Sequence, residues 1–234
     1  MDKDKIAKEF EDFVHIVSHD MAAPQRHIRE FTKLLLASID TPLNDEQKMF
    51  REFIEKGLVR VEKMQDALLA FSRVTTQGKE LEIIQSHECI QSAVEKLAGK
   101  IKECQAKVSV PQQSFPVMGD RAQIEHVFFI LIDNALTYVA DGVTPDICIG
   151  GEVVDGRVEF FVTDNGIGIP LEHSEQIFGM FRKLHAPDAY GGGSGAGLAI
   201  ARKIIRRHGG EISVTGMISG GSCFRFSLLM GNEN

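Results

Sequence analysis

The sequence predicts a helical hairpin that pairs with a second copy into a dimeric four-helix bundle, followed by an α/β sandwich with a mixed, largely antiparallel sheet. Three observations carry this prediction. Apolar residues recur every three or four positions before residue 75, which is the period of amphipathic helices. Helix and strand patterns alternate after that point. Turns at Asp155-Gly156 and in "MISGGS" join strands as antiparallel hairpins do.

The first predicted helix covers residues 5–39. Its period is carried by Ile6, Phe10, Phe13, Val17, Ile28, Phe31, Leu34 and Leu35. The segment "SIDTPLND" contains Pro42 and ends close to Asn44, a favourable N-cap residue, so it is typical of the turn between two helices.

The second predicted helix lies in "EQKMFREFIEKGLVRVEKMQDALLAFSRV", where the period is kept by Phe50, Ile54, Leu58, Val61, Met64, Leu68 and Phe71. Two helices of this length do not bury both apolar stripes in an isolated hairpin. Pairing of two hairpins buries them, which predicts a homodimer. The alternative is that the stripes pack against the following domain.

The polar, glycine-containing segment "TTQGKE" predicts a boundary between a domain at 1–78 and a domain at 79–234. In the second domain we expect helices over 86–106, 121–139 and 196–208. Strands are expected in "DICIGGEVV", "RVEFFVTD", "GEISVTG" and "SCFRFSLL". A layer of helices on a mixed sheet fits this order better than a doubly wound parallel fold.

The composition restricts the class of protein. Of 234 residues, 43% are hydrophobic and 25% are charged, as in ordinary globular domains. A net charge of -7 argues against nucleic-acid binding, and no apolar run is long enough to span a membrane. The charged N-terminus is unlike a signal peptide, so a cytoplasmic location is expected. The four cysteines are scattered singly and are interpreted as reduced structural thiols.

Two glycine motifs point to a ligand. In "VTDNGIGIP", Asp164 can accept a hydrogen bond from a flat ligand while Gly166 and Gly168 allow close backbone approach. A glycine turn after an edge strand is the alternative. In "GGGSGAGLAIARKI", a glycine loop runs into a helix N-terminus, which suits phosphate groups. It is neither a Walker loop nor a dinucleotide fingerprint.

Two further motifs carry polar groups on helices. The apolar helix "IEHVFFILIDNALTYV" contains Asp133 and Asn134, and an asparagine oxygen is a suitable Mg²⁺ ligand; helix capping or solvent exposure is the alternative. In "IVSHDMAAPQRHI", His19 and Asp20 precede Pro24, which weakens the helix one turn further on.

Taken in order, these motifs and the segment "IFGMFRKL" resemble the H, N, G1, F and G2 boxes of sensor histidine kinases. The segments "FVHIVSHD", "LLAFSRV" and "FRKLHAPDAYGGGSGAGLAIARKIIRRHGGEISV" are most similar to the kinase modules of bacterial phytochromes. The resemblance covers residues 13–230 and implies a dimerisation and histidine-phosphotransfer hairpin followed by an ATP-binding domain of the gyrase and kinase type.

The resemblance also implies roles for single residues. His19 receives the γ-phosphoryl group of ATP, and Asp20 orients its ring and accepts a proton. Asp164 binds the adenine amino group, and Asn134 holds Mg²⁺ on the phosphates. The remaining cofactor-binding residues implied by the motifs are Tyr138, Gly166, Gly168, Phe178, Phe181, Arg182, Lys183, Gly193, Gly195, Gly197 and Leu198. Phe178 and Phe181 anchor a lid at 182–194, and Arg182 and Lys183 neutralise phosphate charge.

The family resemblance further implies transfer from His19 to an aspartate in the receiver domain of a response regulator, and an upstream or separate sensor module. Only His19 has the following acid and the proline at the family's spacing, so His15 and His27 are interpreted as solvated. Ala23 replaces a Thr or Asn that orients water in many members, which predicts weak or absent phosphatase activity by that route.

Two other departures from the family pattern leave an alternative function open. Ile130 replaces a second Asn, and Thr137 replaces a basic residue. Both favour a degenerate phosphotransfer scaffold that docks regulators without efficient use of ATP, whereas the intact glycine motifs oppose it. An ATPase of the topoisomerase or mismatch-repair type is disfavoured, because those enzymes carry a catalytic Glu at the position of Ile130.

Overall fold

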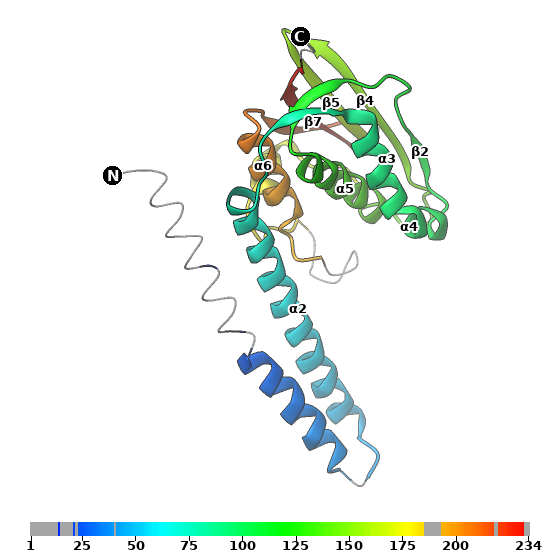
Figure 1. Cartoon of the computed structure of the whole chain (residues 1–234). Helices are drawn as coiled ribbons and strands as arrows, with labels where there is room; N and C mark the ends of the chain where they lie inside the picture. Colours follow the sequence, from blue (N-terminus) through cyan, green and yellow to red (C-terminus); the bar gives the residue numbers. More distant parts are fainter. Residues whose placement is uncertain are drawn as a thin grey trace. The chain divides into compact units, whose positions relative to one another are not determined.

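The structure is a computed structural model that describes residues 14, 21, 23–39, 41–184, 193–217 and 220–231. The candidate phosphate acceptor His19, its neighbour Asp20 and the competing His15 lie outside these residues. The chain forms two compact units, and the main division follows Thr76. Figure 1 shows the helical hairpin of the first unit and the α/β second unit.

The helical hairpin consists of helical residues 23–37 and the 32-residue helix α2 (Asp45–Thr76). The Asn44 side chain accepts a hydrogen bond from the Gln47 N–H at 2.8 Å, and the Gln47 side chain accepts one from the Asn44 N–H at 3.0 Å. This reciprocal pair is a capping box, so the N-cap predicted at Asn44 is confirmed. Arg29 forms an ion pair with Glu62 across the hairpin.

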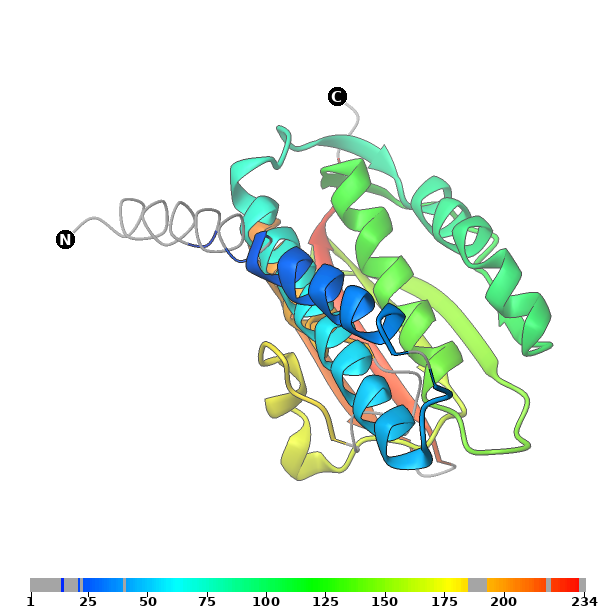
Figure 2. The ribbon, with the colours of Figure 1, turned by 90° about the horizontal axis from the view of Figure 1, so that it is seen from below.

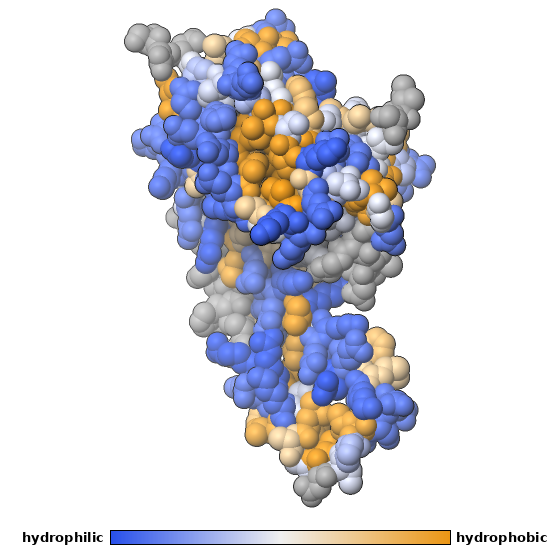
Figure 3. Space-filling view, turned by 90° about the vertical axis from the view of Figure 1, so that its right-hand side faces the viewer, coloured by the Kyte–Doolittle hydropathy of each residue, from blue (hydrophilic) through white to orange (hydrophobic). Residues whose placement is uncertain are grey.

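Much of the apolar stripe predicted for the hairpin is exposed in the single chain. Phe31, Leu35 and Phe53 are 69%, 65% and 67% exposed, and Figure 3 shows apolar atoms gathered at the lower end of the hairpin. The same helices line an apolar groove that contains Pro24 and Ile28 from the first helix and Leu58 and Val61 from α2. The hairpin therefore leaves a large apolar area uncovered within the described residues.

The second unit contains a five-stranded sheet in the order β2-β4-β5-β7-β6. Its strands are β2 (Lys107–Ser109), β4 (Asp146–Val154), β5 (Arg157–Asp164), β6 (Ile212–Gly216) and β7 (Ser222–Leu229). Among the strands that the structure describes in this sheet, only the β2–β4 pair is parallel, so the prediction of a mixed, largely antiparallel sheet is confirmed. A separate antiparallel ribbon joins β1 (Glu82–Gln85) to β3 (Pro116–Gly119).

Helices α3 (Ser86–Lys96), α5 (Arg121–Thr137) and α6 (Gly197–Arg207) form a layer on one face of this sheet, with α5 in contact with both of the others (Figures 1 and 2). The core between the layers is aromatic. The ring of Phe160 on β5 lies 5.5 Å from Phe128 on α5 and 5.3 Å from Phe226 on β7, and all three side chains are fully buried.

The prediction of a single helix over 86–106 is wrong. The chain forms α3 and a short helix α4 (Ala98–Glu103), with a break at Leu97, whose ψ of 3° leaves the helical region. Gln105 then adopts a φ of 53°, a left-handed conformation that ends the helical segment before β2. No helix among the described residues is long and apolar enough to cross a membrane.

Candidate functional site

The carboxylate of Asp164 lies at the end of β5 on the side of the sheet that the helices cover. Its Oδ1 accepts hydrogen bonds from the N–H groups of Gly166 at 2.9 Å and Ser222 at 3.1 Å. Burial raises the pKa of Asp164, and the two N–H groups act in the opposite direction. Because both bonds end on Oδ1, Oδ2 is the oxygen that a ligand would use.

The two glycines after Asp164 are required by the packing of their own backbone. A Cβ at Gly166 would overlap the backbone oxygen of Tyr138, and Gly168 has a φ of 76°. The N–H of Ile167 donates to the same Tyr138 oxygen at 3.0 Å. The motif is therefore more than a turn after a strand, because it attaches the end of β5 to the end of α5.

Three residues that sequence reasoning missed also hold this motif. Gly221, with a φ of 87°, lies so close to the Asp164 backbone oxygen that a Cβ would overlap it, and Ser222 follows with its hydrogen bond. Asn165 donates to the Thr144 oxygen at 2.9 Å and accepts from the Asp146 N–H at 2.9 Å. The "DNG" sequence is a signal for Asn165, since asparagine often bonds to nearby backbone.

The α5 side of the site contains Asn134 and Tyr138, both half-buried and one helical turn apart. Burial raises the pKa of the Tyr138 hydroxyl, and the charge of Asp133 adds to the effect. Ile130, one turn before Asn134, is buried at 6% exposure and packs beside Gly197, where a Cβ would lie 3.2 Å from its Cγ2. This contact brings α5 and the start of α6 together.

Asp133 is paired rather than simply solvated. Its Oδ1 lies 2.6 Å from the Nζ of Lys100 on α4, and the same Nζ hydrogen-bonds to the Thr137 hydroxyl. The Thr137 hydroxyl in turn donates to the Asp133 backbone oxygen at 2.6 Å. A basic group therefore does lie beside Thr137, but it comes from α4 and has no signal in the sequence around the motif.

The lid motif is described at its two ends. Phe178, in the short helix η2 (Gln176–Phe178), is buried and lies under the guanidinium of Arg202 on α6, 5.3 Å from the ring centroid. Phe181 has a φ of 60°, and a Cβ at Gly195 would lie only 2.9 Å from the Arg182 oxygen. Both ends of the segment therefore meet, whereas its middle, 185–192, lies outside the described residues.

The start of α6 has the features of an anion site. Its N-cap is the buried Ala196, which has no side-chain acceptor, so the first N–H groups of the helix are not satisfied by a side chain of that residue. Gly197 and Leu198 form its first turn and are half-buried. Of the two basic candidates from the lid motif, Arg182 is exposed and Lys183 is half-buried, and Gly193 is exposed.

The described residues thus provide the buried carboxylate of Asp164, the amide and phenol of Asn134 and Tyr138 on α5, and the N-terminus of α6, which has positive polarity. Such a set suits a ligand with a hydrogen-bond donor on a flat ring and an anionic group. Among the described residues, no group of three His, Cys, Asp or Glu side chains is placed to hold a metal ion.

Comparison with known proteins gives the family. Residues 119–232 match the family of histidine kinase-, DNA gyrase B-, and HSP90-like ATPases. The chain is 36% identical over 224 residues to cyanobacterial phytochrome B of Nostoc sp., covering 94% of this chain and 29% of that protein. It is 32% identical over 220 residues to the methanogenesis regulatory histidine kinase FilI of Methanothrix harundinacea, covering 94% and 24%.

Solved structures agree in fold. The catalytic domain of the histidine kinase ThkA matches with a TM-score of 0.55 at 26% identity, over 66% of this chain and all of that one. The histidine kinase AdeS of Acinetobacter baumannii matches with a TM-score of 0.62 at 22% identity, over 92% and 98%.

The second unit therefore belongs to the histidine kinase-, gyrase- and HSP90-like ATPase family. The chain as a whole belongs to the sensor histidine kinases, in which it forms a catalytic core of the phytochrome type, so the family recognised from the ordered motifs is confirmed. It spans less than a third of the length of those curated relatives.

Proposed function

We propose that this chain is the catalytic core of an ATP-dependent, homodimeric protein-histidine kinase, with a phosphotransfer domain at 1–78 and an ATP-binding domain at 79–234. One observation carries the proposal: Asp164 is a buried acceptor whose Oδ1 is fixed by the N–H groups of Gly166 and Ser222. A carboxylate held in this way is prepared to accept a hydrogen bond from the adenine amino group.

The other ligand groups follow from this placement. Gly166 and Gly168 form the backbone beside the base, and Asn134 and Tyr138 face the ribose and phosphates from α5. The phosphates lie near the first turn of α6, at Gly197 and Leu198, where the helix dipole favours negative charge. Gly193 and Gly195 complete the loop that leads into this turn.

The lid proposal is supported by the two ends of its segment. Phe178 is buried beside α6, and the backbone of Phe181 and Arg182 packs against Gly195. These contacts fix the two ends of the segment that the family resemblance assigns as the lid. Arg182 and Lys183 follow directly after Phe181, in position to neutralise phosphate charge.

The residues present fit Mg²⁺ that is bound together with the nucleotide. Mg²⁺ in such sites takes few protein ligands and uses phosphate oxygens and water for the rest, which agrees with a single amide oxygen at Asn134. When bound, the ion would neutralise charge on the phosphates. Asn134 would fix its place relative to α5.

Phosphoryl transfer to His19 is proposed from the family resemblance. A ring nitrogen of His19 forms a bond with the γ-phosphorus of ATP, the bond from that phosphorus to the β,γ-bridging oxygen breaks, and ADP leaves. Asp20 accepts the proton from the other ring nitrogen and holds the ring orientation. The phosphoryl group then passes to an aspartate on the receiver domain of a response regulator, and a sensor module controls the rate.

The homodimer is supported by the apolar surface of the hairpin. Phe31, Leu35 and Phe53 are each more than 60% exposed. Gln25, 9% exposed beside the apolar groove, has a side-chain nitrogen with no hydrogen-bond partner among the described residues. A second hairpin packed on this face would cover the apolar side chains and could supply that partner, which gives a four-helix bundle.

A phosphotransfer scaffold with little use of ATP is the second candidate, and it is favoured by Ile130. This side chain is buried beside Gly197 and brings an apolar surface to the proposed phosphate end of the site. The position of Lys100 weakens this candidate, since a cation does stand beside Thr137.

Incubation with γ-labelled ATP and Mg²⁺ separates the two candidates. The kinase proposal expects label on the parent protein that is lost in acid and stable in base, as a phosphohistidine is, and no label on His19→Gln. His27→Gln is the matched control and should retain label. A parent protein that binds ATP but takes up no label would support the phosphotransfer-scaffold candidate. Full labelling of His19→Gln would exclude His19 as the acceptor.

A further inference from the structure

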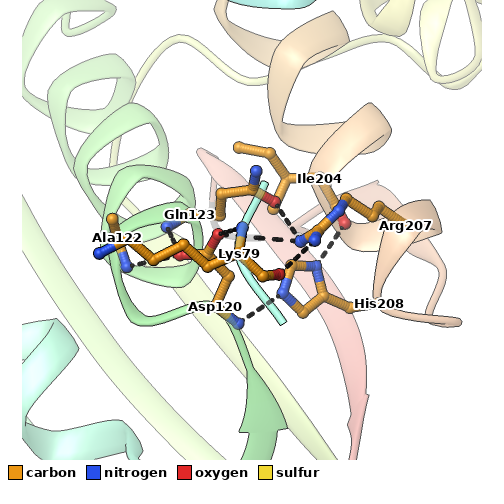
Figure 4. Close-up of polar contacts among 7 residues, drawn as sticks. All are labelled: Lys79, Asp120, Ala122, Gln123, Ile204, Arg207 and His208. Atoms are coloured by element: carbon orange, nitrogen blue, oxygen red, sulfur yellow. Dashed lines mark hydrogen bonds and ion pairs between the residues drawn. The ribbon is translucent and has the colours of Figure 1, made fainter. Parts of the chain in front are cut away.

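A cluster of polar side chains holds the backbone of Lys79, shortly after the end of α2 (Figure 4). Its members come from two places in the second unit: Asp120 at the start of α5, and Arg207 and His208 at the end of α6. These residues are separated by up to 88 positions in the chain, and they have no part in the ATP site described above.

Asp120 connects α5 to Lys79. Its Oδ1 accepts from the N–H groups of Ala122 at 3.1 Å and Gln123 at 3.4 Å, which caps α5. Its Oδ2 accepts from the Lys79 N–H at 2.8 Å. The carboxylate is 4% exposed, so these bonds are formed away from water.

Arg207 binds the other side of the same residue. Its guanidinium donates to the Lys79 backbone oxygen and to Gln123 Oε1 at 3.0 Å, and lies 3.8 Å from Asp120 Oδ2. Both backbone groups of Lys79 are therefore bound to side chains. The guanidinium also packs against Gly78, where a Cβ would overlap it.

His208 fixes the backbone of Asp120 by a hydrogen bond. Its Nε2 accepts from the Asp120 N–H at 2.9 Å, and Nδ1 lies 2.7 Å from the Ile204 oxygen, so Nδ1 carries the proton. The ring is fully buried, and this burial lowers the pKa of His208, in agreement with a neutral imidazole. The cluster is thus built into the ATP-binding domain.

Most of these contacts serve the domain itself, but the bonds to Lys79 do not. The Asp120 bonds to Ala122 and Gln123 cap α5, and the Asp120–His208 and Arg207–Gln123 bonds join the end of α6 to the start of α5. Lys79 is an exposed residue outside any helix or strand, three positions before β1. Because its N–H and its carbonyl oxygen are both bound, the ordered part of the ATP-binding domain extends from β1 toward the N-terminus as far as Lys79.

We propose that Asp120 and Arg207, held by His208, form a clamp that confines the joint between the two domains to Gln77 and Gly78. This inference rests on the proposed kinase function. Asp120 and Arg207 are positioning residues that do not touch ATP. They limit the orientations from which the ATP-binding domain approaches His19, so the rate of phosphoryl transfer depends on them while ATP affinity does not.

The size of the effect follows from the length of the joint. Without the clamp, the free segment grows from the two residues after Thr76 to the five residues that precede β1. The effective concentration of a tethered group falls as roughly the −3/2 power of tether length, which gives about a fourfold decrease. We therefore expect the autophosphorylation rate at saturating ATP to fall by up to about fourfold in Arg207→Gln, the full decrease requiring that the remaining Asp120 bond to the Lys79 N–H also opens.

Two controls distinguish positioning from folding. Arg206→Gln, a neighbouring exposed arginine, should leave the rate unchanged. In Arg207→Gln the loss of the Arg207–Gln123 bond should lower the melting temperature, but the protein should remain folded at the assay temperature with a KM for ATP close to the parent value, while amide hydrogen exchange at Lys79 becomes faster. Arg207→Lys keeps the charge but lacks the planar fork, so it should restore the rate only in part.

A second variant leaves the clamp intact and lengthens the joint. Insertion of a Gly-Ser pair between Gln77 and Gly78 doubles the free segment and should lower the rate about threefold by the same relation. If Lys79 exchanges faster in Arg207→Gln but the rate is unchanged or higher, or if the insertion has no effect, the clamp does not position the domains. A parent protein without label on His19 would instead overturn the proposed function itself.

Discussion

Replacement of Asp164 by asparagine tests the adenine assignment with little change in shape. The Oδ1 atom can still accept from Gly166 and Ser222 at their distances of 2.9 and 3.1 Å. At the other position an NH₂ group replaces Oδ2, so a donor would face the amino group of adenine. A hydrogen bond to a charged group contributes about 1.5 to 3 kcal/mol. Its loss raises the Kd for ATP roughly 10- to 150-fold.

Asp164→Asn should weaken ATP binding without lowering the stability of the folded protein. Because burial raises the folded-state pKa of Asp164 above its ordinary value, the ionised carboxyl costs stability at neutral pH. This cost is present above the folded pKa and disappears as the pH falls below the unfolded pKa of about 3.9. The melting temperature of the variant at pH 7 should therefore equal or exceed that of the parent.

Titration calorimetry with ATP and Mg²⁺ measures the affinity, and differential scanning calorimetry measures the melting temperature. Glu159→Gln is the matched control, because Glu159 also lies on β5 but is 41% exposed and near Arg225. It should bind ATP as the parent does. If Asp164→Asn bound ATP within twofold of the parent, Asp164 would not be the adenine acceptor.

Three further predictions concern the dimer, the core and the pH dependence. Phe53→Glu places a charge on the exposed apolar face of the hairpin and should convert the dimer to monomer in light scattering, whereas a stable dimer would place the interface elsewhere. Phe160→Ala removes the central ring of the aromatic core and should cost about 3 to 5 kcal/mol in urea unfolding; a loss below 1 kcal/mol would contradict the packing. Because burial lowers the folded pKa of His208, the unfolded state binds the proton first, so stability should fall as the pH decreases below about 6.5. His208→Gln should reduce that slope between pH 6.5 and 5, and an unchanged slope would show that His208 is not its source.

The elements that the sequence predicted best are those with long, regular patterns. The helix expected over 121–139 forms as α5 (Arg121–Thr137), and the four expected strands form as β4, β5, β6 and β7. Alternation of buried residues with less buried ones, complete in β5, is a strong local signal. The N-cap at Asn44 was also readable, because the capping box lies within four residues.

Short strands and contacts between distant residues could not be predicted from local sequence patterns. Strand β2 has only three residues and β3 only four, which is too short for a clear alternating pattern. Both form because β4 and β1 lie beside them, and this pairing depends on the tertiary fold. Sequence reasoning singled out Asp164 but not Ser222, since the two are 58 residues apart and meet only when β5 and β7 pair.

The approach of Gly221 and Ser222 to Asp164 changes how the β6–β7 turn should be regarded. By its position between two strands it would be treated as a tolerant surface loop, open to tags, insertions and exchange between homologues. Its last residues instead fix the oxygen and the backbone of the proposed adenine acceptor. Protein engineers should therefore keep the length of this turn and Gly221, since altering them alters the surroundings of Asp164, 58 residues from Ser222 in sequence.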